Sequence, residues 1–200
     1  LSGRFLLLTV AFVMLAEVLI FVPSIARFRA DYLLLKLEKA QIASLARLAT
    51  DGMIMPELEA ELLKNAEVFN VVLRRDDVRQ LVLSSPMPQP VERTYDLRMS
   101  GPLQLISDAM AELVDPQNRV IRVIGHPVQD AGQLIEITMD SMPLRSAMLD
   151  YGLRILLLSA LMMLDHIGER ERGANIRAAL GRTLSAGKVR TRDLGGQAST

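Results

Sequence analysis

The sequence predicts an α+β fold in which a small, mainly antiparallel sheet with flanking helices stands between two apolar helices and precedes a helical tail. Three observations predict it. An apolar run long enough to cross a bilayer covers Phe5–Val22. Between Val68 and Met139 several short runs are rich in β-branched residues, which is typical of strands. A second apolar run covers Ile155–Leu164 and stops at Asp165.

Composition narrows the function classes. The 200 residues have a net charge of zero and only five Phe and three Tyr, with no basic stripe between aromatic residues, so we expect no nucleic-acid binding. The absence of Cys excludes disulfides, thiolate catalysis and Cys-based zinc sites. The chain begins at Leu1 rather than Met, and we expect further residues before it.

Phe5–Val22 is the first predicted membrane helix. Only Thr9 and Glu17 interrupt its eighteen residues, and about twenty apolar residues span a bilayer. A cleaved signal peptide is the alternative, because Ser24 and Ala26 are small residues at a suitable spacing. The apolar core of a signal peptide is shorter, about 7 to 15 residues, and we therefore favour an uncleaved anchor.

The flanking charges bear on orientation. Arg4 precedes the run, whereas Arg27, Arg29, Lys36 and Lys39 follow it. Taken alone, the positive-inside rule places the next segment in the cytoplasm.

Two helices are expected next. The first is long and amphipathic, starts after Pro23, ends at Asp51 and Gly52, and is expected to pack on a partner. The second is Pro56–Ala66, with Pro at its start and acidic residues in its first turns. The apolar stripe of the long helix consists of residues seven apart and their neighbours: Phe28, Leu35, Ile42, Leu45, Leu48 and Ala49.

The central region predicts the sheet. Val68–Leu73 and Val78–Leu83 form a hairpin around the charged residues 74–77, and Leu103–Val114 forms a helix. The other expected strands are Thr94–Leu97 at an edge, Arg119–Ile124 and Gln133–Met139. The expected core residues are Val71, Leu81, Ile121, Val123, Ile135 and Ile137.

From Pro143 onward the sequence is helical again and increasingly apolar. Only ten apolar residues separate Arg154 from Asp165, and the charged segment HIGERERGANIRAAL follows. A transmembrane helix needs about twenty apolar residues, so the second span is expected to be too short.

Three segments of the first part carry a family resemblance: SGRFLLLTVAFVMLAEVLIFVPSIARFRADYL, NVVLRRDDVRQLVLSSPMP and IEITMDSMPLRSAMLDYGLRILLLS. Over about residues 1–159 the chain resembles the sensor portion of alphaproteobacterial two-component sensor histidine kinases. The resemblance implies an extracytoplasmic PAS-like sensor domain between two transmembrane helices of the bacterial inner (cytoplasmic) membrane. It also implies signalling by movement of the second helix relative to the first, in response to an unknown small-molecule stimulus. The expected partners are the lipid bilayer and a second copy, in a homodimer through the membrane and juxtamembrane helices. We let this resemblance, rather than the charge rule, decide the orientation.

The end of the chain resembles another family. LLLSALMMLDHIGERERGANIRAAL and LSAGKVRTRDLGG, within about residues 156–200, are similar to the C-terminus of isocitrate and isopropylmalate dehydrogenases. The expected parts are a transmembrane helix at 1–22, the sensor domain at 23–142, a short membrane-type helix at 143–164 and the dehydrogenase-like tail at 165–200. The abrupt change at Asp165 indicates a chimera, formed by gene fusion, frameshift or mis-assembly of reads. Amplification across the junction from source DNA tests this, since failure to recover one product would mean that no such chain exists.

Two other interpretations stay open. The chain is either a genuine truncated sensor with a cytoplasmic helical tail, or a fragment of a dehydrogenase-family enzyme without its catalytic residues. Seven Lys or Arg against four Asp or Glu in residues 165–200 are compatible with the cytoplasm.

No catalytic, cofactor-binding or metal-binding residue is expected. His126 lies in Gly-His-Pro and His166 precedes Ile-Gly-Glu, whereas a kinase phosphoacceptor needs a context such as H-E-x-x-x-P, so we expect no autophosphorylation. The segment GRTLSAGKV imitates a phosphate-binding loop but has five residues between its glycines instead of four. One candidate ligand pocket consists of Arg93, Tyr95 and Arg98, although an exposed edge strand explains the same residues more simply.

Overall fold

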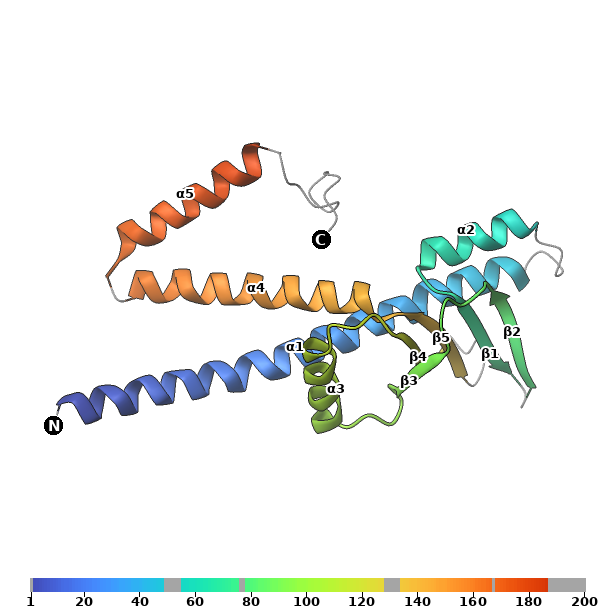
Figure 1. The fold of residues 1–200 in the computed structure, drawn as a ribbon, viewed down its shortest axis with the longest axis horizontal. Helices are drawn as coiled ribbons and strands as arrows, with labels where there is room; N and C mark the ends of the chain where they lie inside the picture. The colour runs from blue at the N-terminus through green and yellow to red at the C-terminus, as the bar shows by residue number, and fades with distance from the viewer. Residues whose placement is uncertain (1, 49–54, 76–77, 128–133, 167, 187–200) are drawn as a thin grey trace. The chain divides into compact units, whose positions relative to one another are not determined.

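The computed structural model describes residues 2–48, 55–75, 78–127, 134–166 and 168–186. They belong to two compact units, Leu1–Met148 and Leu149–Thr200, which we describe separately. The first unit contains the sheet and the helices that pack on it, and the second contains most of α4 together with α5 (Figure 1). The α+β class predicted from the sequence is confirmed.

The first helix, α1, runs without interruption over Ser2–Leu48 and includes Pro23. The sequence placed a boundary at this proline, and the structure instead joins the two predicted helices into one. Proline lacks an N–H and costs about 3 kcal/mol in a helix interior. The turn that follows is anchored, because Ile25 and Ala26 are buried against the rest of the unit. The predicted end of this helix at Asp51 and Gly52 lies outside the described residues.

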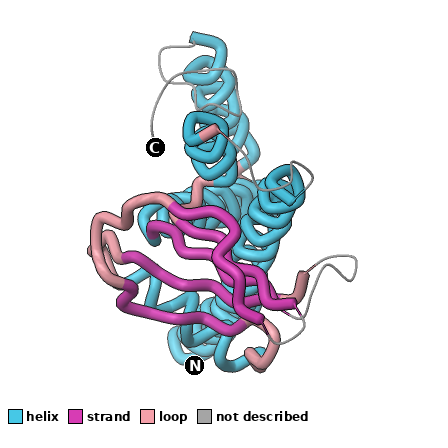
Figure 2. Tube along the Cα trace, turned by 90° about the vertical axis from the view of Figure 1, so that its right-hand side faces the viewer, coloured by secondary structure: helices cyan, strands magenta, loops and turns pink. Residues whose placement is uncertain are grey.

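One mixed sheet forms the centre of the first unit, and its five strands have the order β2-β1-β5-β4-β3. Figure 2 shows the strands side by side in one layer. The strands are β1 Asn70–Arg75, β2 Val78–Ser84, β3 Val91–Asp96, β4 Val120–Gly125 and β5 Leu134–Asp140.

The pairing of β3 makes the sheet mixed. Strands β1 and β2, β1 and β5, and β4 and β5 pair antiparallel, whereas β3 and β4 pair parallel. Parallel neighbours need a crossover, and the helix α3, Pro102–Val114, lies in the connection between β3 and β4. The sheet is therefore mainly antiparallel, as predicted, with β3 at its edge.

One face of the sheet packs under helices. The helix α1 contacts four strands, and both α2, Pro56–Ala66, and α3 pack against α1. Alternate residues of the strands point toward this helical layer and are fully or almost fully buried: Val71, Leu73, Ile121, Val123, Ile135, Ile137 and Met139. Gly125 continues the row, and a Cβ atom there would lie only 2.5 Å from a methyl group of Leu37 in α1. The opposite face is more polar, with Arg122 and Glu136 at 3.9 Å.

Most predicted elements of this unit are confirmed. The helix Pro56–Ala66 has the predicted bounds, and α3 begins one residue earlier than expected. The hairpin, the edge strand and the last two strands are found within a few residues of their predicted bounds. Five of the six expected core residues are buried, and the side chain of Leu81 lies outside the description.

The last strand leads directly into α4, Ser141–His166. The expectation that this second span is too short is wrong on length. Among the residues that the structure describes, α4 is the one helix with the length and composition to cross a membrane, with a mean hydropathy of 1.7 over eighteen residues, most of them exposed. The sequence argument counted only uninterrupted apolar residues. Asp150 and Arg154 break that run but not the helix, because they lie one turn apart and form an ion pair at 3.7 Å.

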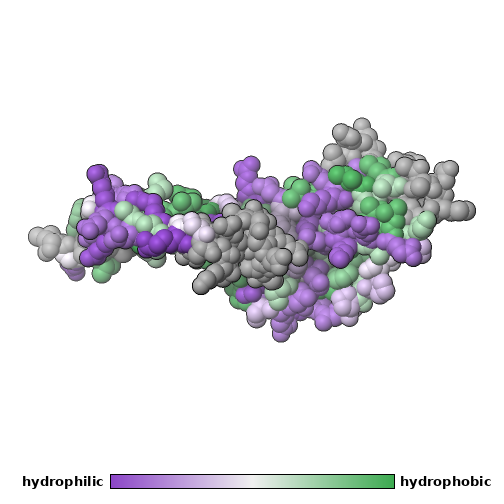
Figure 3. Space-filling model, turned by 90° about the horizontal axis from the view of Figure 1, so that it is seen from above, coloured by the Kyte–Doolittle hydropathy of each residue, from purple (hydrophilic) through white to green (hydrophobic). Residues whose placement is uncertain are grey.

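The second unit continues into α5, Arg170–Ala186. Arg177 of α5 donates two hydrogen bonds, of 3.0 and 3.1 Å, to the carboxylate of Asp165 near the end of α4. These bonds hold the pKa of Asp165 below its usual range. Hydrophilic side chains cover much of α5 (Figure 3). The predicted helical tail is thus found as far as Ala186, and residues 187–200 lie outside the described residues.

Candidate functional site

Three polar side chains meet beneath the helical layer, each from a different element. They are Arg29 of α1, Tyr95 of β3 and Glu112 of α3, and all three are buried. Tyr95 points inward because its register partner is Val123, a core residue of the adjacent parallel strand. Its hydroxyl donates a hydrogen bond of 3.2 Å to Oε2 of Glu112. We call Arg29, Tyr95 and Glu112 the buried triplet.

Arg29 is the exceptional member of the buried triplet. Its exposed fraction is 0%, and its guanidinium lies 4.1 Å from the centre of the Tyr95 ring. This cation–π contact stabilises the positive charge of the guanidinium in part. It leaves Nε, Nη1 and Nη2 of Arg29 without a hydrogen-bond acceptor. Burial raises the pKa of the Tyr95 phenol, and the nearby carboxylate of Glu112 adds to this effect, whereas the cations of Arg93 and Arg29 oppose it.

A network of half-buried ion pairs borders the buried triplet at the edge of the sheet. Arg93 of β3 lies 3.2 Å from Asp115, which follows α3. The same carboxylate accepts a hydrogen bond of 2.7 Å from Nε of Arg119, and Arg119 also pairs with Glu92. Hydrogen bonding from Arg119 lowers the pKa of Asp115. The network ties the end of α3 to β3 and to the start of β4.

Arg98 has a different role from its two predicted companions. Its guanidinium donates hydrogen bonds of 2.9 and 2.7 Å to the carboxylate of Asp96, and its backbone N–H donates to the same group. Hydrogen bonding from Arg98 lowers the pKa of Asp96. Arg98 therefore stabilises the turn after β3.

A cavity of about 400 Å³ lies between β3 and the first half of α3. Of the three residues predicted as a ligand pocket, Arg93 and Tyr95 line it and Arg98 does not. The exposed-edge explanation fits Thr94, which is exposed, but not Tyr95, which is buried. The cavity is lined by Arg93, Thr94, Tyr95, Asp96, Met99, Ser100, Gln104 and Asp108.

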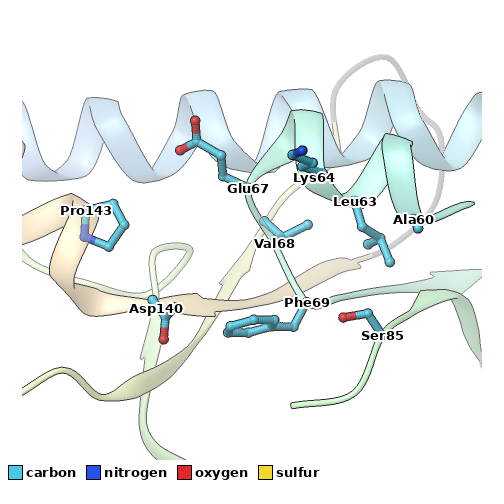
Figure 4. Close-up of a pocket in the computed structure, with 9 residues that line it drawn as sticks. All are labelled: Ala60, Leu63, Lys64, Glu67, Val68, Phe69, Ser85, Asp140 and Pro143. Atoms are coloured by element: carbon cyan, nitrogen blue, oxygen red, sulfur yellow. The ribbon is translucent and has the colours of Figure 1, made fainter. Parts of the chain in front are cut away.

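A second cavity, of about 440 Å³, lies beside the C-terminal end of α2 (Figure 4). Phe69, Val68 and Leu63 give it an apolar floor, and Lys64 and Glu67 stand at its rim. Glu67 is at the left-handed helix cap, with φ 55°. Its carboxylate accepts a hydrogen bond of 2.5 Å from the buried ammonium of Lys36. One charged group of this cavity, the Glu67 carboxylate, thus already contributes to the packing of α2 on α1.

Burial of Tyr32 in α1, together with the negative charge of Glu67, raises the pKa of its phenol to about 12. The ammonium of Lys36 lies 5.3 Å from the centre of the Tyr32 ring. Tyr32, Lys36 and Glu67 therefore form a second polar contact, between α1 and the end of α2.

The two histidines lie apart. His126 follows the end of β4 and is exposed, and His166 is the last residue of α4. Within the described ranges no three His, Asp or Glu side chains are placed to hold a metal ion. Gly187 and Lys188 of the phosphate-loop imitation lie outside the described residues.

Sequence reasoning missed Arg29 and Glu112 as members of a site. Arg29 was counted only as a flanking charge, and Glu112 was taken as part of an ordinary helix. One signal was available: Arg29 falls four residues after Ile25 and four before Leu33, and therefore on the same helical face as two large apolar residues.

Comparison of the chain with protein-family models, with curated proteins and with solved structures finds no match.

Proposed function

We propose that the chain is the membrane-anchored input module of a two-component sensor histidine kinase, with residues 23–142 as an extracytoplasmic PAS-like sensor domain. In this proposal the phosphoacceptor and ATP-binding core are not part of residues 1–200, and the tail after Leu164 is not the output domain. A change in the domain is passed to the membrane helices, and the chain itself catalyses no reaction.

One observation carries the proposal: both apolar helices join the sheet domain without a linker. The helix α1 contains the run Phe5–Val22 and continues unbroken into the layer that covers the sheet. At the other end, β5 finishes at Asp140 and α4 begins at Ser141. A displacement within the domain therefore acts directly on both apolar helices.

Exposure supports a membrane environment for the first apolar run. Large side chains around the helix are open, including Leu8 at 68% and Ile20 at 73%. A helix that is apolar on all sides needs an apolar environment.

The orientation follows the resemblance rather than the charge rule. Of the four cations after Val22, Arg29 and Lys36 are buried inside the domain. These two residues therefore have a role in packing that does not depend on which side of the membrane the domain lies. Their presence on this side of the run is then consistent with an extracytoplasmic domain.

A homodimer through α1 is part of the proposal. The buried side of the second half of α1 faces the sheet, whereas Leu35, Ile42 and Leu45 of the predicted stripe lie on its open side. Leu35, Ile42 and Leu45 are each at least 44% exposed. An apolar stripe at seven-residue spacing, open along a helix, fits the same stripe of a second copy.

Single-cysteine labelling tests the orientation, because the chain has no Cys of its own. Leu103→Cys places a thiol on the exposed start of α3, and Asn175→Cys places one on the exposed side of α5. With a membrane-impermeant maleimide on intact cells from which the outer membrane has been removed, we expect labelling of the first variant. The second should be labelled only after lysis.

Either of two outcomes contradicts the proposal. Labelling of Leu103→Cys only after lysis would place the domain in the cytoplasm, and recovery of the chain in the soluble fraction would remove the membrane anchor. Oxidative cross-linking of Cys at positions 35 and 42 in the same background should give dimers.

A further inference from the structure

The helix α5 buries almost none of its surface within the described part of the chain. Of its residues whose burial the structure describes, only Gly173 is buried, and the others are exposed or half-exposed. An isolated helix of about this length is marginal in water, because most of the stability of protein helices comes from the packing of an apolar face. The apolar face of α5 therefore points to a partner outside the described residues.

The apolar face of α5 is a single row of residues. Gly173, Ile176 and Leu180 are three and four residues apart, and this spacing brings them to the same side of the helix. Ile176 is 40% exposed and Leu180 is half-exposed. In the sequence, Leu184 follows Leu180 at the same spacing. We call Ile176 and Leu180 the apolar row.

The charged residues of α5 are arranged around the apolar row. By the helical period, Arg172 and Arg177 fall on its two flanks, whereas Glu171, the one acidic residue in the sequence of α5, falls on the opposite side. Arg172 lies 3.3 Å from Glu169, and Arg177 binds Asp165, so these two arginines also neutralise the acids at the junction with α4. A row of apolar residues between arginines, with the acid on the far side, is typical of a helix that lies in the plane of a membrane surface.

The contact between α5 and the end of α4 gives the apolar row its direction. The two helices meet at their junction (Figure 1), where a Cβ atom on Gly173 would lie 3.2 Å from Oδ1 of Asp165 and 3.7 Å from Cβ of Leu164. The side of α5 that touches the end of α4 is therefore the side that carries the apolar row. Met162, in the last turns of α4, is 72% exposed, so apolar side chains are open on both helices near this junction.

We propose that α5 lies on the surface of the membrane, with the apolar row at the boundary between lipid headgroups and acyl chains and with its arginines at anionic headgroups. This placement rests on the proposed function, because α4 crosses the membrane only in that proposal. The helix α4 ends at His166 and α5 begins at Arg170, so α5 starts where the span ends. A movement of α4 along its axis then has to pull α5 against the lipid surface, through the bonds between Asp165 and Arg177.

A second copy of α5 is a poorer partner for the apolar row than lipid. In paired helices, the positions beside an apolar seam attract one another when their charges are opposite. Both flanks of the apolar row carry arginine, so two copies of α5 would bring like charges together. Anionic headgroups on the cytoplasmic side of a membrane instead attract arginine.

Fluorescent labelling of single cysteines in the full chain tests this placement, because the chain has no Cys of its own. Ile176→Cys and Leu180→Cys attach a polarity-sensitive fluorophore to the apolar row, and Ala178→Cys attaches it to the opposite, exposed side as the matched control. In vesicles of phosphatidylethanolamine and phosphatidylglycerol, we expect the two row positions to emit at shorter wavelength than position 178. Lipids with a nitroxide on the acyl chain should also quench the row positions more strongly.

A polar substitution in the row should reverse both signals. With the fluorophore at position 176, Leu180→Asn should shift the emission to longer wavelength and reduce the quenching, because it removes the neighbouring apolar side chain from the same face. Ser185→Asn, on the far side of the helix, should leave both signals unchanged.

Two outcomes would overturn the placement of α5. Equal emission and equal quenching at positions 176, 178 and 180 would mean that the apolar row lies in water. Emission at short wavelength without quenching by nitroxide lipids would mean that protein, such as a second copy, covers the row. Flotation of the labelled chain with the vesicles separates this inference from the proposed function. A chain that floats but gives either outcome overturns the inference alone, whereas a chain that does not float overturns both.

Discussion

The two halves of α1 belong to one helix but have opposite relations to their surroundings. In the first half the large side chains are apolar and open, as at Phe12, which is 72% exposed. In the second half the buried side includes polar groups, among them Arg29, Lys36 and Ser44. The first half thus shows apolar side chains where a water-exposed helix is polar, and the second half buries cations that a membrane helix would exclude.

This difference shows how one helix can serve two environments. The first half depends on what surrounds the chain, because its large side chains that the structure describes are open. The second half depends on the sheet, α2 and α3, because its own Leu33, Leu37 and Ala40 are buried in their packing. The same substitution should therefore have different effects on stability and on membrane insertion in the two halves.

The largest expected effect is on the stability of the sheet domain. Leu33 is 0% exposed, so Leu33→Ala should lower the free energy of unfolding by about 2–5 kcal/mol, through lost burial and a cavity. Leu19→Ala in the first half, where the side chain is 64% exposed, should change it by less than about 0.5 kcal/mol. Hydrogen exchange of the β5 amides in detergent measures both. Equal protection in the two variants would mean that the second half does not hold the domain together.

The next effect concerns the first half alone. If residues 5–22 cross the bilayer, Leu15→Arg should oppose insertion by about 3 kcal/mol. The matched change in the second half is Leu45→Arg, on the open side of the helix, and it should leave insertion unchanged. The membrane-bound fraction of each variant gives the comparison. Full membrane recovery of Leu15→Arg would argue against a span at 5–22.

The sequence predicted those parts of the fold that depend on local pattern. Pro at the start of Pro56–Ala66 and the apolar runs around residues 74–77 are local signals, and both elements are where they were expected. The continuity of α1 through Pro23 was not predicted, because a proline signals a helix end, and only the packing that follows it shows otherwise. The length of α4 was missed for a different reason, since the sequence argument counted only uninterrupted apolar residues and did not use the one-turn spacing of Asp150 and Arg154.

The candidate site was predicted only in part. Arg93 and Tyr95 were predicted as members of a polar ligand pocket together with Arg98, and these two do line one cavity. Arg29 is 66 residues from Tyr95 in the sequence. Its approach depends on how α1 packs across the sheet, which no local pattern encodes. The inward direction of Tyr95 likewise follows from the parallel pairing with β4, which placed it beside Val123.

The smallest expected effect is the loss of stability at high pH through the titration of Tyr32 in the second half of α1. The pKa of Tyr32 is raised from 10.0 to about 12, first by burial and then by Glu67. The folded state therefore favours the neutral phenol. Its contribution to stability is complete below pH 10 and is lost as the pH rises from 10 to about 12. In a titration of phenolate absorbance, Tyr32→Phe should remove the component near pH 12.

Matched variants locate the cause of this shift. Glu67→Gln should move the component part of the way toward pH 10, because it removes the charge and keeps the burial. Tyr151→Phe, in the other unit of the chain, should leave the component in place. A Tyr32 that titrates near its ordinary value would mean that α2 does not pack on this part of α1. The contrast between the two halves would then begin further along the helix, beyond Tyr32.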